Sequence, residues 1–108
     1  MEMAKYILCI LRSNLNILFS WGFNRPIAVE NGLKFSVNGF KHKGIVEVRY
    51  NEGADLFDIE LTNSENQLVE KIEGVYLDQL IEVIDEHVEH VDNYIDVVRQ
   101  EYPYLNNL

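Results

Sequence analysis

The sequence predicts an α+β domain with an N-terminal helix, an antiparallel meander of three to four strands, and a long C-terminal helix packed on one sheet face. Leucines recur every three or four residues near the start, and a similar apolar spacing returns over the last third. Between them, hydrophobic residues alternate with polar ones. The 108 residues, 47% of them hydrophobic and 25% charged, suit one small folded domain over 1–108.

The first predicted helix runs from about Met3 to Trp21. Gly22 suits the position just past a helix end, and Pro26 lies beyond it as a stop. Arg12 and nearby polar residues interrupt the apolar run, and no small-residue cleavage site follows, so we expect an ordinary helix and not a signal peptide. The lone Cys9 is expected as a buried thiol in a reducing compartment, which indicates a cytoplasmic protein. No apolar run approaches the ~20 residues that a membrane span needs.

A period of two predicts the strands in the middle of the chain. The first covers 33–37 and ends at Asn38-Gly39, a dipeptide that favours a two-residue hairpin turn. The second runs from Phe40 to Tyr50, and Gly44 is expected to mark a bend or bulge within it. The third and fourth predicted strands cover 57–61 and Leu68 to Ile72.

The last predicted element is a long helix from about Tyr76 to Glu101. Its apolar seam steps by four and three, through Leu77, Ile81, Ile84, Val88, Val91, Ile95 and Val98. A neighbouring stripe holds Tyr76, Gln79, Val83, His87, His90, Tyr94 and Val97. An acidic ridge on the opposite side consists of Asp78, Glu82, Asp85, Glu86, Glu89, Asp92 and Asp96. One helix is therefore expected to present an apolar face to the domain and a carboxylate face to solvent.

The predicted length of this helix bears on association. About 26 residues would make a helix about 39 Å long, whereas four strands make a sheet under about 20 Å wide. The helix would then overhang its own sheet, and a contiguous apolar patch rarely stays exposed on a monomer. We predict a homodimer interface formed by Val91, Tyr94, Ile95, Val97 and Val98. The alternative is that this seam packs on the first helix.

The histidines of the last helix are candidate metal ligands. His87 and His90 are three residues apart, and Glu86 could add an oxygen. The order H-x-E-H differs from the H-E-x-x-H of zinc proteases, and His42 is the one other imidazole in the sequence. The apolar stripe continues on either side of the two histidines, so half-buried structural histidines are favoured, and no metal or cofactor is expected.

Charge is unevenly distributed along the chain. Residues 1–50 carry seven basic and three acidic groups, whereas residues 51–108 carry two basic and fifteen acidic groups, for a net charge of −9. Four basic residues fall on the predicted hairpin: Lys34, Lys41, Lys43 and Arg49. The order helix, three strands, helix is similar to that of double-stranded-RNA-binding domains, which need a basic start to the last helix. Here that helix starts "VYLDQLIEVIDE", and the net charge repels a polyanion, so direct nucleic-acid binding is disfavoured.

The search for a catalytic signature finds no glycine-rich phosphate loop, no G-x-S-x-G and no C-x-x-C. Most carboxylates are predicted on a solvated ridge, where no burial would separate their proton affinities, so enzyme activity is disfavoured. The expected function is a non-enzymatic protein-interaction or scaffolding domain that self-associates through the long helix. The alternatives are an acidic inhibitor that imitates nucleic-acid phosphates and blocks a DNA-binding protein, and a metal-dependent enzyme. A basic protein is a possible partner in the inhibitor case.

Overall fold

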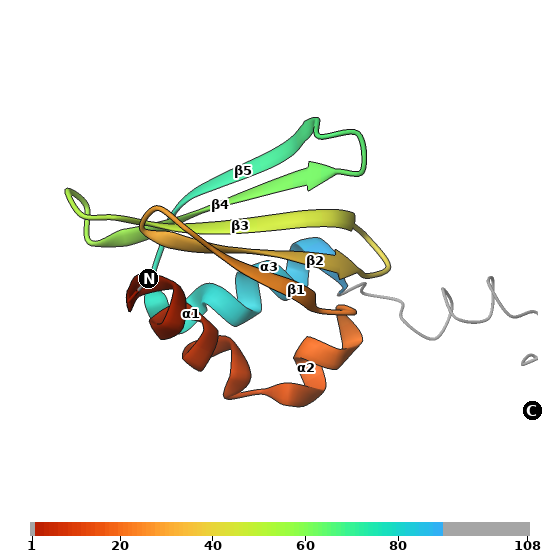
Figure 1. Cartoon of the computed structure of the whole chain (residues 1–108), viewed down its shortest axis with the longest axis horizontal. Coiled ribbons are helices and arrows are strands. Elements are labelled where there is room, and N and C mark those ends of the chain that lie inside the picture. Colours follow the sequence, from red (N-terminus) through yellow and green to blue (C-terminus); the bar gives the residue numbers. More distant parts are fainter. Residues whose placement is uncertain (1, 90–108) are drawn as a thin grey trace, which may run out of the picture.

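The fold is a five-stranded antiparallel sheet with helices on one face (Figure 1). The computed structural model describes residues 2–89. The strands follow one another across the sheet in chain order, which confirms the predicted α+β class, antiparallel meander and flanking helices. The elements are α1 (Glu2–Arg12), α2 (Leu15–Ser20), β1 (Asn24–Val29), β2 (Gly32–Asn38), β3 (Lys43–Asn51), β4 (Leu56–Asn63), β5 (Leu68–Val75), the 3-10 helix η1 (Leu77–Gln79) and α3 (Leu80–Val88).

The core lies between the sheet and the helices. Every second residue of the central strands is buried, as the period of two predicts: Leu33, Phe35, Val37, Val46, Val48, Phe57, Ile59 and Leu61. The helical side contributes Ile7, Leu11, Leu18, Leu80, Ile84 and Val88. Trp21 is fully buried at the end of α2, and its ring stacks on that of Phe35 with centroids 6.4 Å apart. One hydrophobic cluster therefore joins α1, α2 and α3 to the sheet.

The predicted first helix is in fact two helices. Ser13 and Asn14 separate the two helices because their side chains form hydrogen bonds with nearby backbone groups. Such bonds compete with the backbone hydrogen bonds that continue a helix. The Ser13 hydroxyl donates to the carbonyl of Ile10, and the Asn14 side chain accepts from the amide of Ile17 and caps α2. The break turns Leu15 outward, where it is 53% exposed. The predicted burial of Cys9 on α1 is wrong, because its side chain is exposed.

The sheet has one more strand than predicted at its start, because β1 lies ahead of the first predicted strand. Five of its six residues are exposed, so it shows no alternation. Its pairing with β2 is irregular around Arg25 and Pro26, where Arg25 has a φ of 53° and Pro26 has no amide to donate. Such an edge strand is invisible to a search for alternating burial.

The predicted two-residue turn of the β2–β3 hairpin and the predicted bulge at Gly44 are also wrong. Asn38 pairs with Lys43, so the hairpin closes around four residues and not around a two-residue turn. The pairing runs without interruption through Gly44 on both sides, so this glycine marks no bulge. It is needed because a Cβ there would overlap the carbonyl oxygen of Thr62 on β4.

The C-terminal helix α3 has nine residues and ends at Val88, not near residue 101. The β2–β3 loop caps it, because the amides of Lys41 and His42 donate to the Val88 carbonyl at 2.8 and 3.3 Å. A helix continuing through this point would direct that carbonyl to an amide four residues further on. At about 13.5 Å, α3 is too short to overhang the sheet. The part of the predicted helix from residue 90 onward lies outside the described residues.

Candidate functional site

The acidic ridge predicted on the last helix separates into two groups. Asp78, Glu82 and Glu86 are exposed. Asp85 and Glu89 are half-buried and turned toward the domain: the indole Nε1 of Trp21 donates to Asp85 Oδ1 at 2.8 Å, and the amide of Phe40 donates to Glu89 Oε2 at 2.9 Å. These two carboxylates therefore hold α3 in place, whereas the first three face outward. The remaining two ridge residues, Asp92 and Asp96, lie outside the described residues.

Glu89 lies beside a polar hollow at the end of α3. Ser20, Asn38, Gly39, Phe40 and Lys43 complete the lining of this hollow, whose volume is about 280 Å³. Burial raises the pKa of the Glu89 carboxyl, the hydrogen bond from the Phe40 amide lowers it, and the charge of Asp85 raises it further. The net pKa is above the ordinary value, so the ionised form of Glu89 is less favoured in the folded chain than in the unfolded one.

The candidate metal ligands do not come together in the described part of the chain. His87 Nδ1 lies 2.8 Å from the Val83 carbonyl and must donate to it, while Nε2 lies 3.5 Å from Glu70 Oε1 on β5. Glu86 is exposed, and its backbone carbonyl accepts from Lys41 Nζ at 2.7 Å. No group of three His, Cys, Asp or Glu residues within 2–89 could hold a metal ion. His90 lies outside those residues.

The four basic residues of the predicted hairpin are dispersed. Lys34 and Arg49 lie on the face of the sheet that the helices leave uncovered, because they alternate with buried neighbours. Lys41 reaches the end of α3, and Lys43 lines the polar hollow. The four cations therefore form no single basic face of the kind that a nucleic-acid interface requires.

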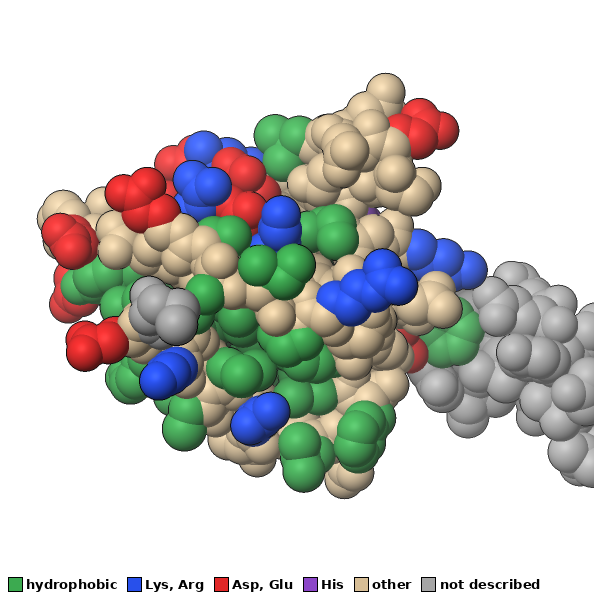
Figure 2. Space-filling model, in the orientation of Figure 1, with side chains coloured by type: hydrophobic (Ala, Val, Ile, Leu, Met, Phe, Trp, Pro, Cys, Tyr) green, Lys and Arg blue, Asp and Glu red, His purple; other side chains and the backbone are tan. Residues whose placement is uncertain are grey.

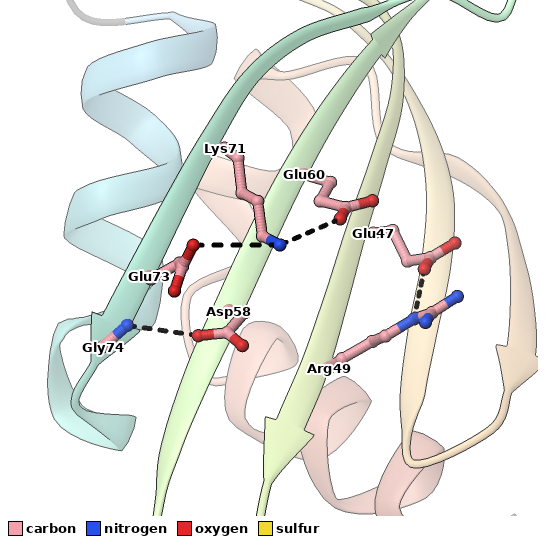
Figure 3. Close-up of polar contacts among 7 residues, drawn as sticks. All are labelled: Glu47, Arg49, Asp58, Glu60, Lys71, Glu73 and Gly74. Atoms are coloured by element: carbon pink, nitrogen blue, oxygen red, sulfur yellow. Dashed lines mark hydrogen bonds and ion pairs between the residues drawn. The ribbon is translucent and has the colours of Figure 1, made fainter. Parts of the chain in front are cut away.

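The uncovered sheet face carries charges of both signs that bond to one another (Figure 3). Glu47 on β3 lies opposite Glu60 on β4, an unfavourable pairing that neighbouring cations offset. Arg49 Nε pairs with Glu47, and Lys71 Nζ lies 3.8 Å from Glu60 and from Glu73. Asp58 Oδ1 also accepts from the amide of Gly74 at 3.2 Å. Ion pairs at exposed sites contribute about 0.2–1 kcal/mol each, and here Arg49 and Lys71 are both engaged by carboxylates of the same face.

A more distinctive feature is a pocket of about 500 Å³ where the start of α1 meets the β3–β4 turn and η1. We call it the tyrosine pocket. It is lined by Met3, Tyr6, Tyr50, Asp55, Phe57, Tyr76, Leu77 and Asp78. Tyr50 and Phe57 are register partners on β3 and β4, and their rings pack with centroids 5.3 Å apart. Tyr6 and Tyr76 are 48% and 60% exposed, so aromatic surface contributed by separate elements is open to solvent.

The electrostatics of the tyrosine pocket are acidic. The Tyr50 hydroxyl donates to Asp55 Oδ1 at 2.6 Å. This hydrogen bond raises the pKa of Tyr50, as do desolvation and the charges of Asp55 and Glu52. Asp78 adds a carboxylate from η1, and no lysine or arginine is among the described residues that line the pocket. Aromatic surface and carboxylates, with no lysine or arginine among the described lining residues, make an environment that suits a positive charge.

A second exposed surface lies on the helices. Leu15 and Phe19 are four residues apart on α2 and are 53% and 76% exposed. Nearby, Leu8 and Cys9 line an open groove on the outer side of α1 whose other lining residues are Lys5, Arg12 and Ser13. Figure 2 shows hydrophobic side chains reaching the surface on this lower side of the molecule, with basic side chains among them. A single continuous helix would place Leu15 on the same face as Leu11 and Leu18, so the leucine spacing gave no sign of this surface.

The chain matches no protein-family model, no curated protein and no solved structure. Within residues 2–89, no helix has the length and apolar character needed to cross a membrane. The fold and its surfaces define a small helix-covered antiparallel sheet with an acidic aromatic pocket at one end.

Proposed function

We propose that this protein is a non-enzymatic protein-interaction domain that binds a basic partner at the end of the fold where the tyrosine pocket lies. The observation that carries the proposal is the combination of open tyrosine rings and carboxylates in one pocket. Tyrosine is enriched among the residues that dominate binding energy at protein interfaces. The carboxylates specify the sign of the partner's charge.

The wider charge distribution supports a basic partner. The net charge of −9 attracts a positively charged protein at long range and accelerates its encounter. Asp78 belongs both to the pocket and to the outward-facing group that continues with Glu82 and Glu86 along η1 and α3. If the partner is a nucleic-acid-binding protein, the same carboxylates act as an imitation of phosphates, and the protein is its inhibitor.

The experiment is affinity capture with matched charge variants, followed by affinity measurement on the purified pair. The double variant Asp55→Asn, Asp78→Asn removes two pocket charges at nearly constant shape. The control, Glu65→Gln, removes an exposed charge from the β4–β5 turn, at the opposite end of β4 from the pocket residue Phe57. We expect a basic protein to be captured by the unmodified chain and the control but not by the double variant, with affinity falling as salt rises. A purified partner that binds all three chains equally and ignores salt would contradict the proposal.

Self-association is a second candidate function, and the exposure of Leu15 and Phe19 favours it. Large apolar side chains gathered on one helix face are typical of protein contacts, and we propose a second copy of this chain as the occupant. The predicted dimer seam (Val91, Tyr94, Ile95, Val97 and Val98) lies outside the described residues and remains a separate proposal for the same property.

Sedimentation at about 100 μM, well above micromolar affinities, tests self-association. Phe19→Asp should convert a dimer to a monomer without unfolding it, because Phe19 is 76% exposed. Asn16→Asp adds the same charge at an exposed site of α2 and should leave the dimer intact. The variant Ile95→Asp reports on the predicted seam independently. A clean monomer of the unmodified chain would rule out both surfaces.

A further inference from the structure

We infer that the tyrosine pocket binds a cationic side chain, the ammonium of lysine or the guanidinium of arginine, presented by the partner. This inference rests on the proposed function for the source of the cation, but the chemistry of the pocket is testable without any partner. Three features of the lining support a cationic ligand: its aromatic rings, its carboxylates, and the absence of lysine and arginine among the described lining residues.

The rings that line the pocket come from separate parts of the fold. Tyr6 lies on α1, Tyr50 on β3, and Tyr76 immediately before η1, where its backbone is extended with φ −72° and ψ 151°. A cation within about 6 Å of a ring centroid is attracted by the negative face of the ring. Met3, Phe57 and Leu77 supply apolar surface between the rings, which suits the aliphatic stem of a long basic side chain.

The carboxylates are positioned to receive the charged end of such a side chain. The Tyr50 hydroxyl bonds to one oxygen of Asp55, which orients this carboxylate, and an ionised carboxylate has the capacity to accept further hydrogen bonds. The same bond uses the proton of Tyr50, so this residue offers its ring and not a donor to an incoming ligand. Asp78 contributes a second carboxylate from η1. A lysine or arginine entering the pocket would then meet ring surface along its stem and carboxylate oxygens at its end.

The lining also argues against other ligands. An anion would meet two carboxylates and, among the described lining residues, no cation. A purely apolar side chain would gain contact with the rings but nothing from Asp55 or Asp78, and its binding would not depend on salt. The lining thus favours a ligand with an apolar stem and a positive end, which is the structure of lysine and arginine side chains.

The test is a nuclear magnetic resonance titration of the full chain with three small probes. These are Nα-acetyl-lysine methylamide, the corresponding arginine compound, and the norleucine compound, which keeps the stem but has no charge. We expect saturable shifts of amide resonances around Tyr6, Asp55 and Leu77 with the two cationic probes below about 50 mM, a range that covers millimolar dissociation constants. Norleucine should bind at least fivefold more weakly. Equal binding of norleucine, or no saturable shift with either cation, would overturn the inference.

Two variants separate the ring contribution from the charge contribution. Tyr76→Leu keeps apolar bulk but removes a ring, and Asp78→Asn keeps shape but removes a charge. Both residues are exposed, so neither change should disturb the fold. Each change should weaken binding of the lysine probe about two- to fivefold, while Glu65→Gln should leave the affinity unchanged. If both variants bind the probe as the unmodified chain does, the inference is overturned.

The outcomes also distinguish this inference from the proposed function. Binding of the lysine probe without any basic partner would uphold the inference and contradict the proposed function. A basic partner lost in the Asp55→Asn, Asp78→Asn variant, together with a pocket that ignores the cationic probes, would uphold the proposed function and contradict the inference, because the partner would then recognise the surface charge without inserting a side chain.

Discussion

The contact between the β2–β3 loop and the end of α3 makes a strong prediction about Gly39. A Cβ added at Gly39 would overlap the carbonyl oxygen of Val88, and it would lie 2.7 Å from Val88 Cγ1 and 2.9 Å from Glu89 Oε2. The backbone atom cannot rotate away, so either the loop or the helix end must move. Gly39→Ala is therefore expected to separate the loop from α3.

The magnitude follows from what that separation disrupts. Overpacking in a well-packed site costs about 1–3 kcal/mol. The hydrogen bonds from the amides of Lys41 and His42 to Val88 weaken as the loop moves, and each contributes about 0.5–1.5 kcal/mol. Replacing glycine by alanine also restricts the unfolded chain, which by itself raises the free energy of unfolding by about 0.4–1 kcal/mol. We expect a net loss of about 2–3 kcal/mol in the free energy of unfolding.

The matched control is Gly53→Ala in the β3–β4 turn. A Cβ there would meet the Asn51 side chain at 3.5 Å, an ordinary van der Waals distance, so this variant should be neutral or slightly stabilised. Urea denaturation followed by the fluorescence of Trp21 measures both, because Trp21 is the one tryptophan of the chain and is fully buried. A Gly39→Ala protein within about 0.5 kcal/mol of the unmodified chain, the range of ordinary surface changes, would refute the capped end of α3.

Three further predictions concern ionisable groups. Glu89→Gln should stabilise the protein at pH 7. The raised pKa of Glu89 means that the protonated carboxyl stabilises the fold at low pH and that this stabilisation is lost as the pH rises through that pKa, whereas glutamine stays neutral. Unfolding curves of the two proteins should therefore converge below about pH 4. Asp55→Asn should lower the pKa of Tyr50, because it replaces the ionised acceptor of the Tyr50 hydroxyl by a neutral amide and removes a nearby negative charge; a pH titration of the Tyr50 ring resonances measures this, and an unchanged titration would place Asp55 elsewhere. His87→Gln should change the free energy of unfolding by less than about 1.5 kcal/mol, since it removes one partly buried hydrogen bond to Val83 and a contact with Glu70; a larger loss in urea denaturation would assign His87 a greater role in the packing of α3.

Local pattern was sufficient to predict the central strands and the buried side of α3. Phe35, Val48 and Ile59 are buried where alternation placed them, and Ile84 and Val88 are buried where the four-three spacing placed them. These residues carry their signal in their immediate neighbours, because one face of each element must be apolar to pack. The same rule failed for β1, which lies at a sheet edge and buries almost nothing.

The features that the sequence concealed depend on contacts between distant residues. The end of α3 is set by a loop more than 40 residues earlier, through Lys41 and His42, and the apolar spacing past Val88 gave no warning of it. The tyrosine pocket joins α1, the β3–β4 turn and η1, which are adjacent only after folding. Its local signal was the cluster of turn residues between Tyr50 and Phe57, with acidic groups at Glu52 and Asp55. Such a cluster is typical of a turn and does not indicate a binding surface.

Whether the tyrosine pocket recognises positive charge can be read from the ring resonances of the tyrosines themselves. The chain has six tyrosines, of which Tyr6, Tyr50 and Tyr76 line the pocket. In a titration with a lysine-containing peptide, those three should shift together, saturate at one dissociation constant and return toward their starting positions as salt is added. A matched peptide with norleucine in place of lysine should shift them with at least fivefold weaker binding and without dependence on salt. Shifts confined to the other tyrosines, or equal shifts with both peptides, would show that the pocket does not recognise positive charge.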